Sequence, residues 1–244
     1  MTTTAAVWKE SPIVQRFLGY RAALPLASEQ IGVMLALLGT RPAPVSRFID
    51  LGCGDGILGA AVLGQYPDAH GLLVDFSEPM LVRAREQLAD VSPRLEFLQL
   101  DYGDPAWVEA VRSSGPFEAI VSGYSIHHQP DERKRAIYAE IFDLLAPGGW
   151  FVNIEHVSSA TQTNIDLFEK HYIDARYAIE LQNGETRSRA EIEQEYTHRP
   201  DKAANILAPV EVQCDWLRVI GFQEVDCYFR VYELAVFAGR RPGL

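Results

Sequence analysis

The chain has 244 residues, of which 48% are hydrophobic and 23% are charged, and its formal net charge is −11 at pH 7. This composition is that of an ordinary globular protein, long enough to bury a substantial core. The excess of acidic side chains argues against a surface that follows a phosphate backbone, so we expect no nucleic-acid partner.

The cysteines and the N-terminal residues bear on location. Cys53, Cys214 and Cys227 are odd in number, widely spaced and free of a CxxC pair, a pattern typical of reduced thiols. The first residues lack a basic stretch followed by an apolar one, and the apolar run from Ile31 to Leu38 is too short to span a membrane. We expect a cytoplasmic protein that does not enter the membrane, either a monomer or a homodimer.

Apolar runs and helical patterns alternate through the first two thirds of the chain. A helix is expected from Ser28 to Leu38, stopped by Gly39 and Pro42. Other helices are expected from Ser77, from Asp104 to about residue 113, and over 131–145. The strands expected between them lie at 47–51, 72–75, 95–100, 117–122 and 150–155. This alternation predicts βαβ units and a parallel sheet.

The last third of the chain has a different pattern. Residues 156–205 contain two polar helical stretches, near 164–181 and 188–196, and no convincing strand. A helix over 209–220 then ends at Gly221, and two apolar runs follow at 224–229 and 232–238. We interpret the two runs as a final strand pair.

The strongest motif follows the first strand. Asp50 is followed by Gly52, Gly54 and Gly56 at alternate positions, and Asp75 ends the next apolar run. Glycines at such a turn let the backbone approach a ligand closely, and an acid at the second strand end suits ribose hydroxyls. The pattern therefore predicts a cofactor that carries adenosine.

The spacing of the glycines separates two kinds of cofactor. A dinucleotide site requires G-x-G-x-x-G, but Ile57 occupies the position of the third glycine and Gly59 comes too late. The carboxylate of Asp50 would also crowd a pyrophosphate, whereas it suits a ligand with a positive charge. A nicotinamide-dependent oxidoreductase is therefore disfavoured.

The sequence D-x-G-x-G-x-G with a downstream acid resembles motif I of the class I S-adenosylmethionine (SAM) dependent methyltransferases of the small-molecule type. The resemblance covers residues 46–155 well and the last forty residues moderately. It implies an α/β fold: a Rossmann-like, doubly wound, seven-stranded and mostly parallel sheet with a C-terminal antiparallel strand pair and a helical cap. The implied segments are a helical lid (1–45), the SAM-binding core (46–155), the cap (156–205) and a C-terminal helix with the strand pair (206–244).

The resemblance also implies SAM as the cofactor, S-adenosylhomocysteine as the product, and a set of binding residues. The glycine loop would surround the methionine part, Asp75 the ribose, and Asp101 with Tyr102 the adenine. A Tyr20-Arg21 pair resembles a lid that reaches the methionine carboxylate. The implied cofactor residues are Tyr20, Arg21, Asp50, Gly52, Cys53, Gly54, Gly56, Asp75, Phe76, Met80, Asp101, Tyr102, Ser122 and Tyr124.

Catalytic candidates follow the fourth and fifth strands. His127 and His128 lie in the loop that faces the transferable methyl in the family, and either could deprotonate an acceptor. Glu155 and His156 end the fifth strand. Neighbouring residues of a strand point in opposite directions, so the four side chains cannot easily meet, and we expect no bound metal.

The resemblance implies transfer of the sulfonium methyl to an oxygen, nitrogen or carbon nucleophile of a small molecule. Small molecules are favoured as substrates because the 156–205 insertion is long enough to enclose a site. Two alternatives stay open. One is transfer that involves a carboxylated SAM derivative, which a second arginine at the methyl would favour. The other is a module that binds SAM without catalysis.

Overall fold

The computed structural model describes residues 26–199, 202 and 204–243. Its centre is a seven-stranded sheet with the order β3-β2-β1-β4-β5-β7-β6. The strands are β1 Arg47–Leu51, β2 His70–Asp75, β3 Leu95–Gln99, β4 Phe117–Gly123, β5 Leu145–His156, β6 Gln223–Val231 and β7 Leu234–Arg240. β1 to β5 pair in parallel, and β7 pairs antiparallel with both β5 and β6. The predicted Rossmann-like fold with a final antiparallel pair is confirmed.

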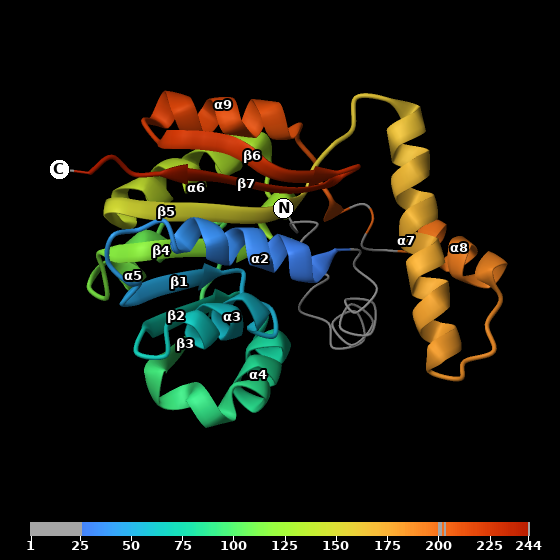
Figure 1. The fold of residues 1–244 in the computed structure, drawn as a ribbon, viewed down its shortest axis with the longest axis horizontal. Coiled ribbons are helices and arrows are strands. Elements are labelled where there is room, and N and C mark those ends of the chain that lie inside the picture. Colours follow the sequence, from blue (N-terminus) through green and yellow to red (C-terminus); the bar gives the residue numbers. More distant parts are fainter. Residues whose placement is uncertain (1–25, 200–201, 203, 244) are drawn as a thin grey trace.

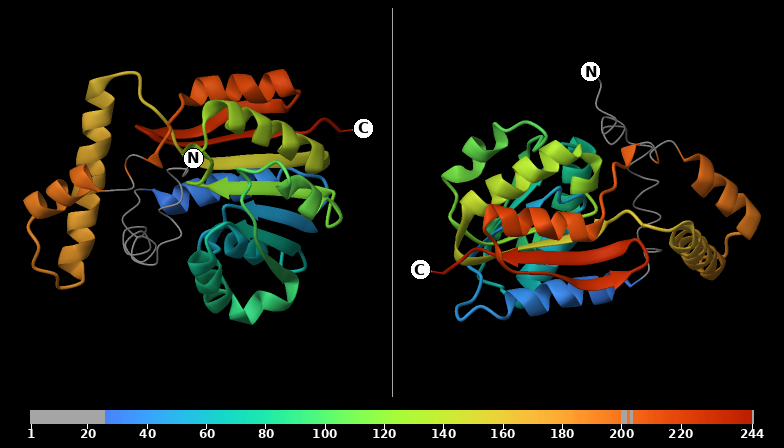
Figure 2. Two further views of the ribbon diagram at one scale, coloured as in Figure 1. Left: turned by 180° about the vertical axis from the view of Figure 1, so that it is seen from behind. Right: turned by 90° about the horizontal axis from the view of Figure 1, so that it is seen from above.

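Helices cover both faces of the sheet (Figure 2). One face carries α2 Ala27–Leu38, α3 Ile57–Gln65 and α4 Glu78–Gln87, and the other carries α5 Trp107–Arg112, α6 Asp131–Leu144 and α9 Val210–Ile220. Two short 3-10 helices, η2 Ala89–Arg94 and η3 Ile126–His128, complete this body. Each face has its own apolar core. Met34 and Val62 belong to the core under α2 and α3, and Ile141 and Leu217 belong to the core under α6 and α9. The sheet is therefore buried on both sides, as parallel sheets require.

Most predicted boundaries lie within about two residues of the observed ones, and two elements start three or more residues from the predicted position. β5 starts at Leu145, five residues early, because the turn at Gly148 is held against the sheet edge by Arg41 Nη1 and Arg240 Nε, which both donate to its carbonyl. α5 starts only at Trp107, because the Asp104 carboxylate accepts a bond of 2.9 Å from the backbone N–H of Ala106 and closes a turn before the helix.

The insertion after β5 forms the helical pair α7 Gln162–Gln182 and α8 Arg189–His198, which stands beside the sheet body in Figure 1. α8 begins with a capping box in which Ser188 and Glu191 bond reciprocally. Because α7 follows the carboxyl end of β5, the pair rises at the edge where parallel α/β sheets bind ligands. Within the described residues, no helix is long and apolar enough to cross a membrane.

The α9 helix offers a test of the core assignment. Leu217 is fully buried between α9 and the sheet, whereas Val219, two residues later, is 88% exposed. We predict that Leu217→Ala lowers the free energy of unfolding by about 2–5 kcal/mol, because it leaves a cavity in a packed core. Val219→Ala on the same helix should change it by less than about 0.5 kcal/mol. Urea unfolding of both variants measures the difference, and equal midpoints would contradict the packing described here.

Candidate functional site

The glycine loop after β1 adopts a backbone conformation that favours glycine. Gly52, Gly54 and Gly56 have φ of 69°, 56° and 84°. The loop is anchored from below by Asp50, whose fully buried carboxylate accepts a 2.8 Å bond from the N–H of Gly59 in the first turn of α3. Asp50 therefore fixes the strand-to-helix turn, and the loop backbone faces the carboxyl edge of the sheet.

Asp75, at the end of β2, lies beside this loop. Its Oδ2 accepts the N–H of Gly54 at 2.9 Å and its Oδ1 accepts the N–H of Ser77 at 2.8 Å. Burial raises the pKa of Asp75 to about 6, although the backbone hydrogen bonds act in the opposite direction. A carboxylate oxygen has two lone pairs, so each can accept a further bond from a ribose hydroxyl.

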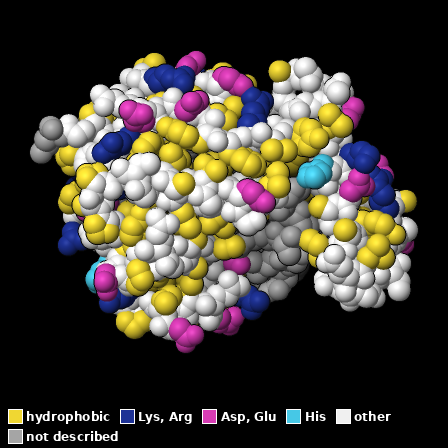
Figure 3. Space-filling model, in the orientation of Figure 1, with side chains coloured by type: hydrophobic (Ala, Val, Ile, Leu, Met, Phe, Trp, Pro, Cys, Tyr) yellow, Lys and Arg dark blue, Asp and Glu magenta, His cyan; other side chains and the backbone are white. Residues whose placement is uncertain are grey.

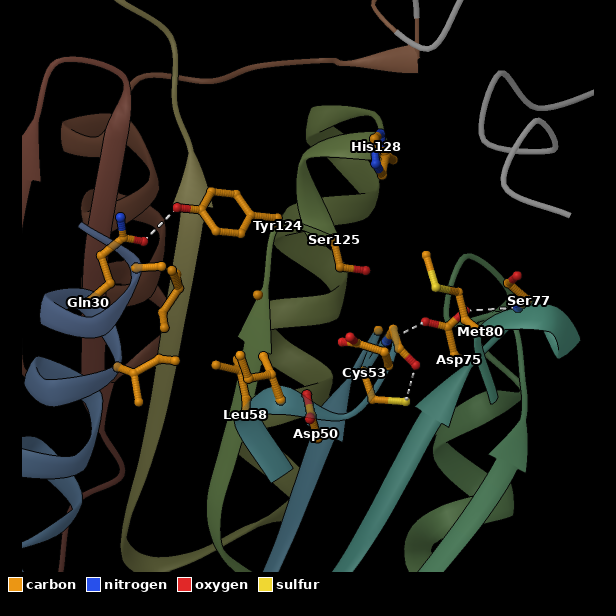
Figure 4. A pocket seen from close by; sticks show the side chains of 18 of the residues that line it. Gln30, Asp50, Cys53, Leu58, Asp75, Ser77, Met80, Tyr124, Ser125 and His128 are labelled. Atoms are coloured by element: carbon orange, nitrogen blue, oxygen red, sulfur yellow. Dashed lines mark hydrogen bonds between the residues drawn. The ribbon is translucent and has the colours of Figure 1, made fainter. Parts of the chain in front are cut away.

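A cavity of about 430 Å³ opens at this edge. In Figure 4, Asp75, Ser77 and Met80 form one side, Gln30 and Tyr124 form the opposite side, and His128 stands above them. The lining residues are Ala27, Gln30, Ile31, Asp50, Gly52, Cys53, Gly54, Asp55, Ile57, Leu58, Asp75, Phe76, Ser77, Met80, Gly123, Tyr124, Ser125, His128 and Ile154. Three aspartates and no lysine or arginine belong to this described lining, so the cavity attracts positive charge.

Tyr124 connects α2 to the loop after β4. Its hydroxyl donates to Gln30 Oε1 at 2.6 Å, and its backbone has a φ of 50°, uncommon for a residue with a side chain. Such strain persists where surrounding contacts enforce it, here the bond to Gln30 and a 2.8 Å bond from the Tyr124 N–H to the carbonyl of Ile154.

The loops after β1 and β4 approach each other closely at Gly52. A Cβ at this position would lie 1.8 Å from the Oγ of Ser125, which is itself 2.6 Å from the hydroxyl of Tyr102. The site therefore requires glycine here for space as well as for backbone conformation. A cofactor that lies along the loop fits this arrangement, because glycine backbone and the Asp75 carboxylate face the same cavity.

Beyond the cavity, His127 and Glu155 form a buried pair. His127 Nδ1 lies 2.5 Å from Glu155 Oε1, and the His127 backbone N–H donates to Oε2 at 3.0 Å. Burial lowers the pKa of His127 well below its usual value, and the charges of His156 and Lys134 act in the same direction. Burial raises the pKa of Glu155 to about 7. The environment thus disfavours the charged form of each partner.

The other two catalytic candidates have different surroundings. His128 lines the cavity, and its Nδ1 lies 3.1 Å from the carbonyl of Ala204. His156 Nε2 lies 3.0 Å from Glu233 Oε2, and its ring packs 5.0 Å from that of Phe168 in α7. The rings of His128 and His156 lie 4.0 Å and 5.9 Å from the ring of His127, which contacts Glu155, so the expectation that the four side chains cannot easily meet was wrong. Of the four, His128 belongs to the described lining of the cavity.

Several cofactor candidates do not line the cavity. Gly56 faces Leu73 and Leu88, and the buried Ser122 donates to the carbonyl of Leu51. Asp101 accepts from Gly103 in its own turn, and Tyr102 is buried behind Ser125. Tyr20 and Arg21 lie outside the described residues. Among those described, no group of three or more His, Cys, Asp or Glu is arranged to hold a metal.

Ten lining residues were not among the predicted site residues: Ala27, Gln30, Ile31, Asp55, Ile57, Leu58, Ser77, Gly123, Ser125 and Ile154. Asp55 lies between Gly54 and Gly56, and Ser77 lies two residues after Asp75, so the motif could have predicted that both line the cavity. Gln30 gave no local signal, since a single glutamine on a helix is ordinarily a surface residue, and here it is fully buried.

Comparison with known proteins agrees with this geometry. A family model described as a methyltransferase domain matches residues 48–149. A carboxy-S-adenosyl-L-methionine synthase from Chromohalobacter salexigens is 29% identical over 222 residues, which is 88% of this chain and 76% of that protein. A malonyl-[acyl-carrier protein] O-methyltransferase from Magnetococcus marinus is 36% identical over 80 residues, 33% of this chain and 27% of that protein.

Solved structures share the fold. An O-methyltransferase family protein from Burkholderia thailandensis has a TM-score of 0.69 at 15% identity over 99% of this chain. Human N-acetylserotonin methyltransferase in complex with SAM has a TM-score of 0.61 at 14% identity over 100% of this chain. This chain spans 63% and 59% of those two chains, and at such identities the likeness shows the fold alone.

The methyltransferase-domain match over residues 48–149, together with the methyltransferase relatives, supports a class I SAM-dependent methyltransferase, an enzyme whose cofactor is SAM.

Asp75 gives a pH-dependent test. An ionised carboxylate accepts hydroxyl hydrogen bonds that its protonated form partly loses, so cofactor binding should favour the charged form. With a pKa of about 6, the affinity for S-adenosylhomocysteine should be constant above that pH and fall by up to about tenfold per pH unit below it. Calorimetric titration from about pH 5 to about pH 8 measures this. Asp75→Asn should bind more weakly and without this pH dependence; an unchanged profile in the variant would exclude the role.

Gly52 gives a steric test. We predict that Gly52→Ala weakens S-adenosylhomocysteine binding at least about tenfold, since the new methyl collides with Ser125 and the φ of 69° is strained. Gly64→Ala in α3 is the matched control, because nothing lies within 4 Å of the added Cβ. Calorimetry and thermal melts of both variants separate lost binding from lost folding. Equal affinity in the two variants would contradict the close approach.

Proposed function

We propose that the chain transfers the sulfonium methyl of SAM to an oxygen, nitrogen or carbon nucleophile of a small molecule. The observation that carries the proposal is that the glycine loop, Asp75 and an imidazole, His128, line one cavity. Bound SAM supplies a methyl that is already activated, so the protein needs chiefly to align the acceptor and exclude water. The apolar wall of Ile57, Leu58 and Ile154 suits the exclusion of water.

The histidines of η3 are proposed to handle the acceptor's proton. His128 reaches the cavity, and the ring of His127 packs 4.0 Å from it with Glu155 on its other side. A base that is itself oriented by a third group is the usual arrangement for activating a hydroxyl or an amine. His156, at the end of β5, bonds Glu233 in the turn between β6 and β7, and neither residue belongs to the described lining of the cavity.

A second candidate is formation of a carboxylated SAM derivative. It is favoured by relatives that match most of this chain: proteins from Chromohalobacter salexigens and Shewanella amazonensis, each covering 88% of it, are named carboxy-S-adenosyl-L-methionine synthase. The arginine expected for such chemistry has one described candidate near the histidines. Arg199 acts electrostatically on His127 and packs with its guanidinium 4.0 Å from the ring of Tyr196.

Charge favours the first candidate. A carboxylated cofactor would add a negative charge to a cavity lined by Asp50, Asp55 and Asp75, with Glu155 close behind it. The plain sulfonium adds a positive charge to the same surroundings, which is the favourable sign. A SAM-binding module without catalysis would not require an imidazole on the cavity wall.

We propose a small molecule as the acceptor. Relatives that match about half of this chain include proteins named ribosomal RNA methyltransferases, from Pasteurella multocida and Streptomyces griseus. The net charge of −11 opposes an RNA surface. On the face shown in Figure 3, acidic and basic side chains of the described residues are interspersed, without an extended basic area.

Binding of SAM and of its carboxylated derivative distinguishes the two candidates. We predict that SAM binds at least about tenfold more tightly, because the extra carboxylate meets like charge. Calorimetry measures both affinities, and mass spectrometry of nucleosides retained by the purified protein identifies the natural occupant. Arg199→Met should leave both affinities unchanged. Tighter binding of the carboxylated compound, lost in Arg199→Met, would instead establish the second candidate.

A further inference from the structure

The chain returns from the cap to α9 through residues 204–208, here called the return segment. It is bonded directly to the histidine turn η3. The Ile206 N–H donates to the carbonyl of His127 at 2.9 Å, and the carbonyl of Ala204 lies 3.1 Å from His128 Nδ1. The side chain of Asn205 hydrogen-bonds the ring of His127. Both histidines are therefore held by the segment that carries the cap.

The far end of the return segment is also fixed. The carbonyl of Ala208 accepts the N–H of Ser158 and the Nε2 of Gln213, each at 3.1 Å. Ser158 lies where the chain leaves β5 for the cap, so the outgoing and returning connections are bonded to each other.

Lys134, in the first half of α6, holds the middle of the segment. Its side chain is only 1% exposed, and its Nζ donates to the carbonyl of Ile206 and, at 2.7 Å, to Asp131 Oδ1. Burying an ammonium is costly, and an apolar side chain of similar length often serves stability as well or better. The ammonium bonds the carbonyl of Ile206, in the segment whose residues contact His127 and His128.

We propose that Lys134 is a positioning residue. Its ammonium fixes the return segment, and the Ala204 carbonyl in turn holds His128 as the Nδ1–H tautomer, with Nε2 as the basic nitrogen on the cavity side. The inference rests on the proposed function, because a basic nitrogen matters only if an acceptor must lose a proton.

The tautomer of His128 follows from the atom that its Nδ1 contacts, the carbonyl oxygen of Ala204. A carbonyl oxygen can only accept, so the Nδ1 of His128 must carry the proton of that bond, and the lone pair then lies on Nε2. The acceptor's O–H or N–H bond would break as its proton moves to Nε2. The acceptor's electron pair would form the new bond to the methyl while the methyl–sulfur bond breaks, and that bond's electron pair would stay on the sulfur of S-adenosylhomocysteine. The charged and titratable groups around the two rings are Glu155 and His156 from β5, Lys134 and Asp131 from α6, and Arg199 beyond α8.

Nitrogen NMR tests the tautomer directly. Long-range ¹H–¹⁵N spectra of the full-length protein are recorded at about pH 8, above the usual imidazole pKa of about 6.5. The signals of the six histidines are assigned with His128→Gln as the reference for His128. We expect His128 to show a protonated Nδ1 and an unprotonated Nε2, with and without S-adenosylhomocysteine. The Nε2–H form, which is commoner in water, would overturn the proposal.

Lys134→Met tests the positioning. We expect the Nδ1–H signature of His128 to give way to a mixture of tautomers, and exchange of the Ile206 amide to accelerate at least about tenfold. Amides within β4 and β5 should be unaffected. Lys170→Met is the matched control, since Lys170 forms an exposed ion pair with Asp174 on the cap, and it should change neither readout.

The remaining outcomes also decide the matter. An unchanged tautomer and unchanged exchange in a folded Lys134→Met overturn the proposal. Lys134→Gln, which keeps a donor without the charge, is the second variant; if both fail to fold, Lys134 is structural and the proposal is also overturned. Titration with S-adenosylhomocysteine is run in parallel. Its failure would count against the proposed function, while the tautomer of the free protein would still test the placement of His128.

Discussion

Contact between the loop after β1 and the loop after β4 is the constraint on which the rest of the site depends. β1 and β4 are neighbours in the sheet, so their carboxyl ends leave it side by side. At Gly52 the two loops are so close that no side chain fits against Ser125. The cofactor loop and the histidine turn are therefore adjacent because of strand order, although 71 residues separate Leu51 from Ser122 in that register pair.

Buried carboxylates around this contact perform different tasks because of where they lie. Asp50 lies at the cavity floor and holds the strand-to-helix turn through Gly59, whereas both oxygens of Asp75 accept bonds from the backbone N–H groups of Gly54 and Ser77. Glu155 lies a layer behind and gathers bonds from His127 and His156. Asp50 and Asp75, together with Asp55, give the cavity a negative potential that complements a sulfonium and that no lysine or arginine in the described lining offsets.

The parts of the site that the sequence predicted are those encoded locally. Asp50, Gly52, Gly54 and Asp75 follow from a spacing that only a strand-turn-helix unit satisfies, and the alternation of runs indicated the sheet. The contacts that were not predicted join residues far apart in the chain: Tyr124 with Gln30, and His156 with Glu233. No local pattern encodes such pairs, because they depend on how helices and loops pack.

The early start of β5 escaped prediction for a similar reason, since arginines from other elements hold its first turn. The division of the chain into lid, core and cap stays a prediction.

The cap is held together by its own contacts. Arg176, only 2% exposed, bonds Glu180 within α7 and Glu195 in α8, and Ile173, Ile192 and Tyr196 form a small separate core. It enters the fold at one place in the chain order, between β5 and α9, so the sheet need not change when the cap does. The two helices can therefore vary in sequence while the contacts of the cofactor loop at Gly52 and Asp75 stay the same, provided that the connections bonded to the histidine turn are kept.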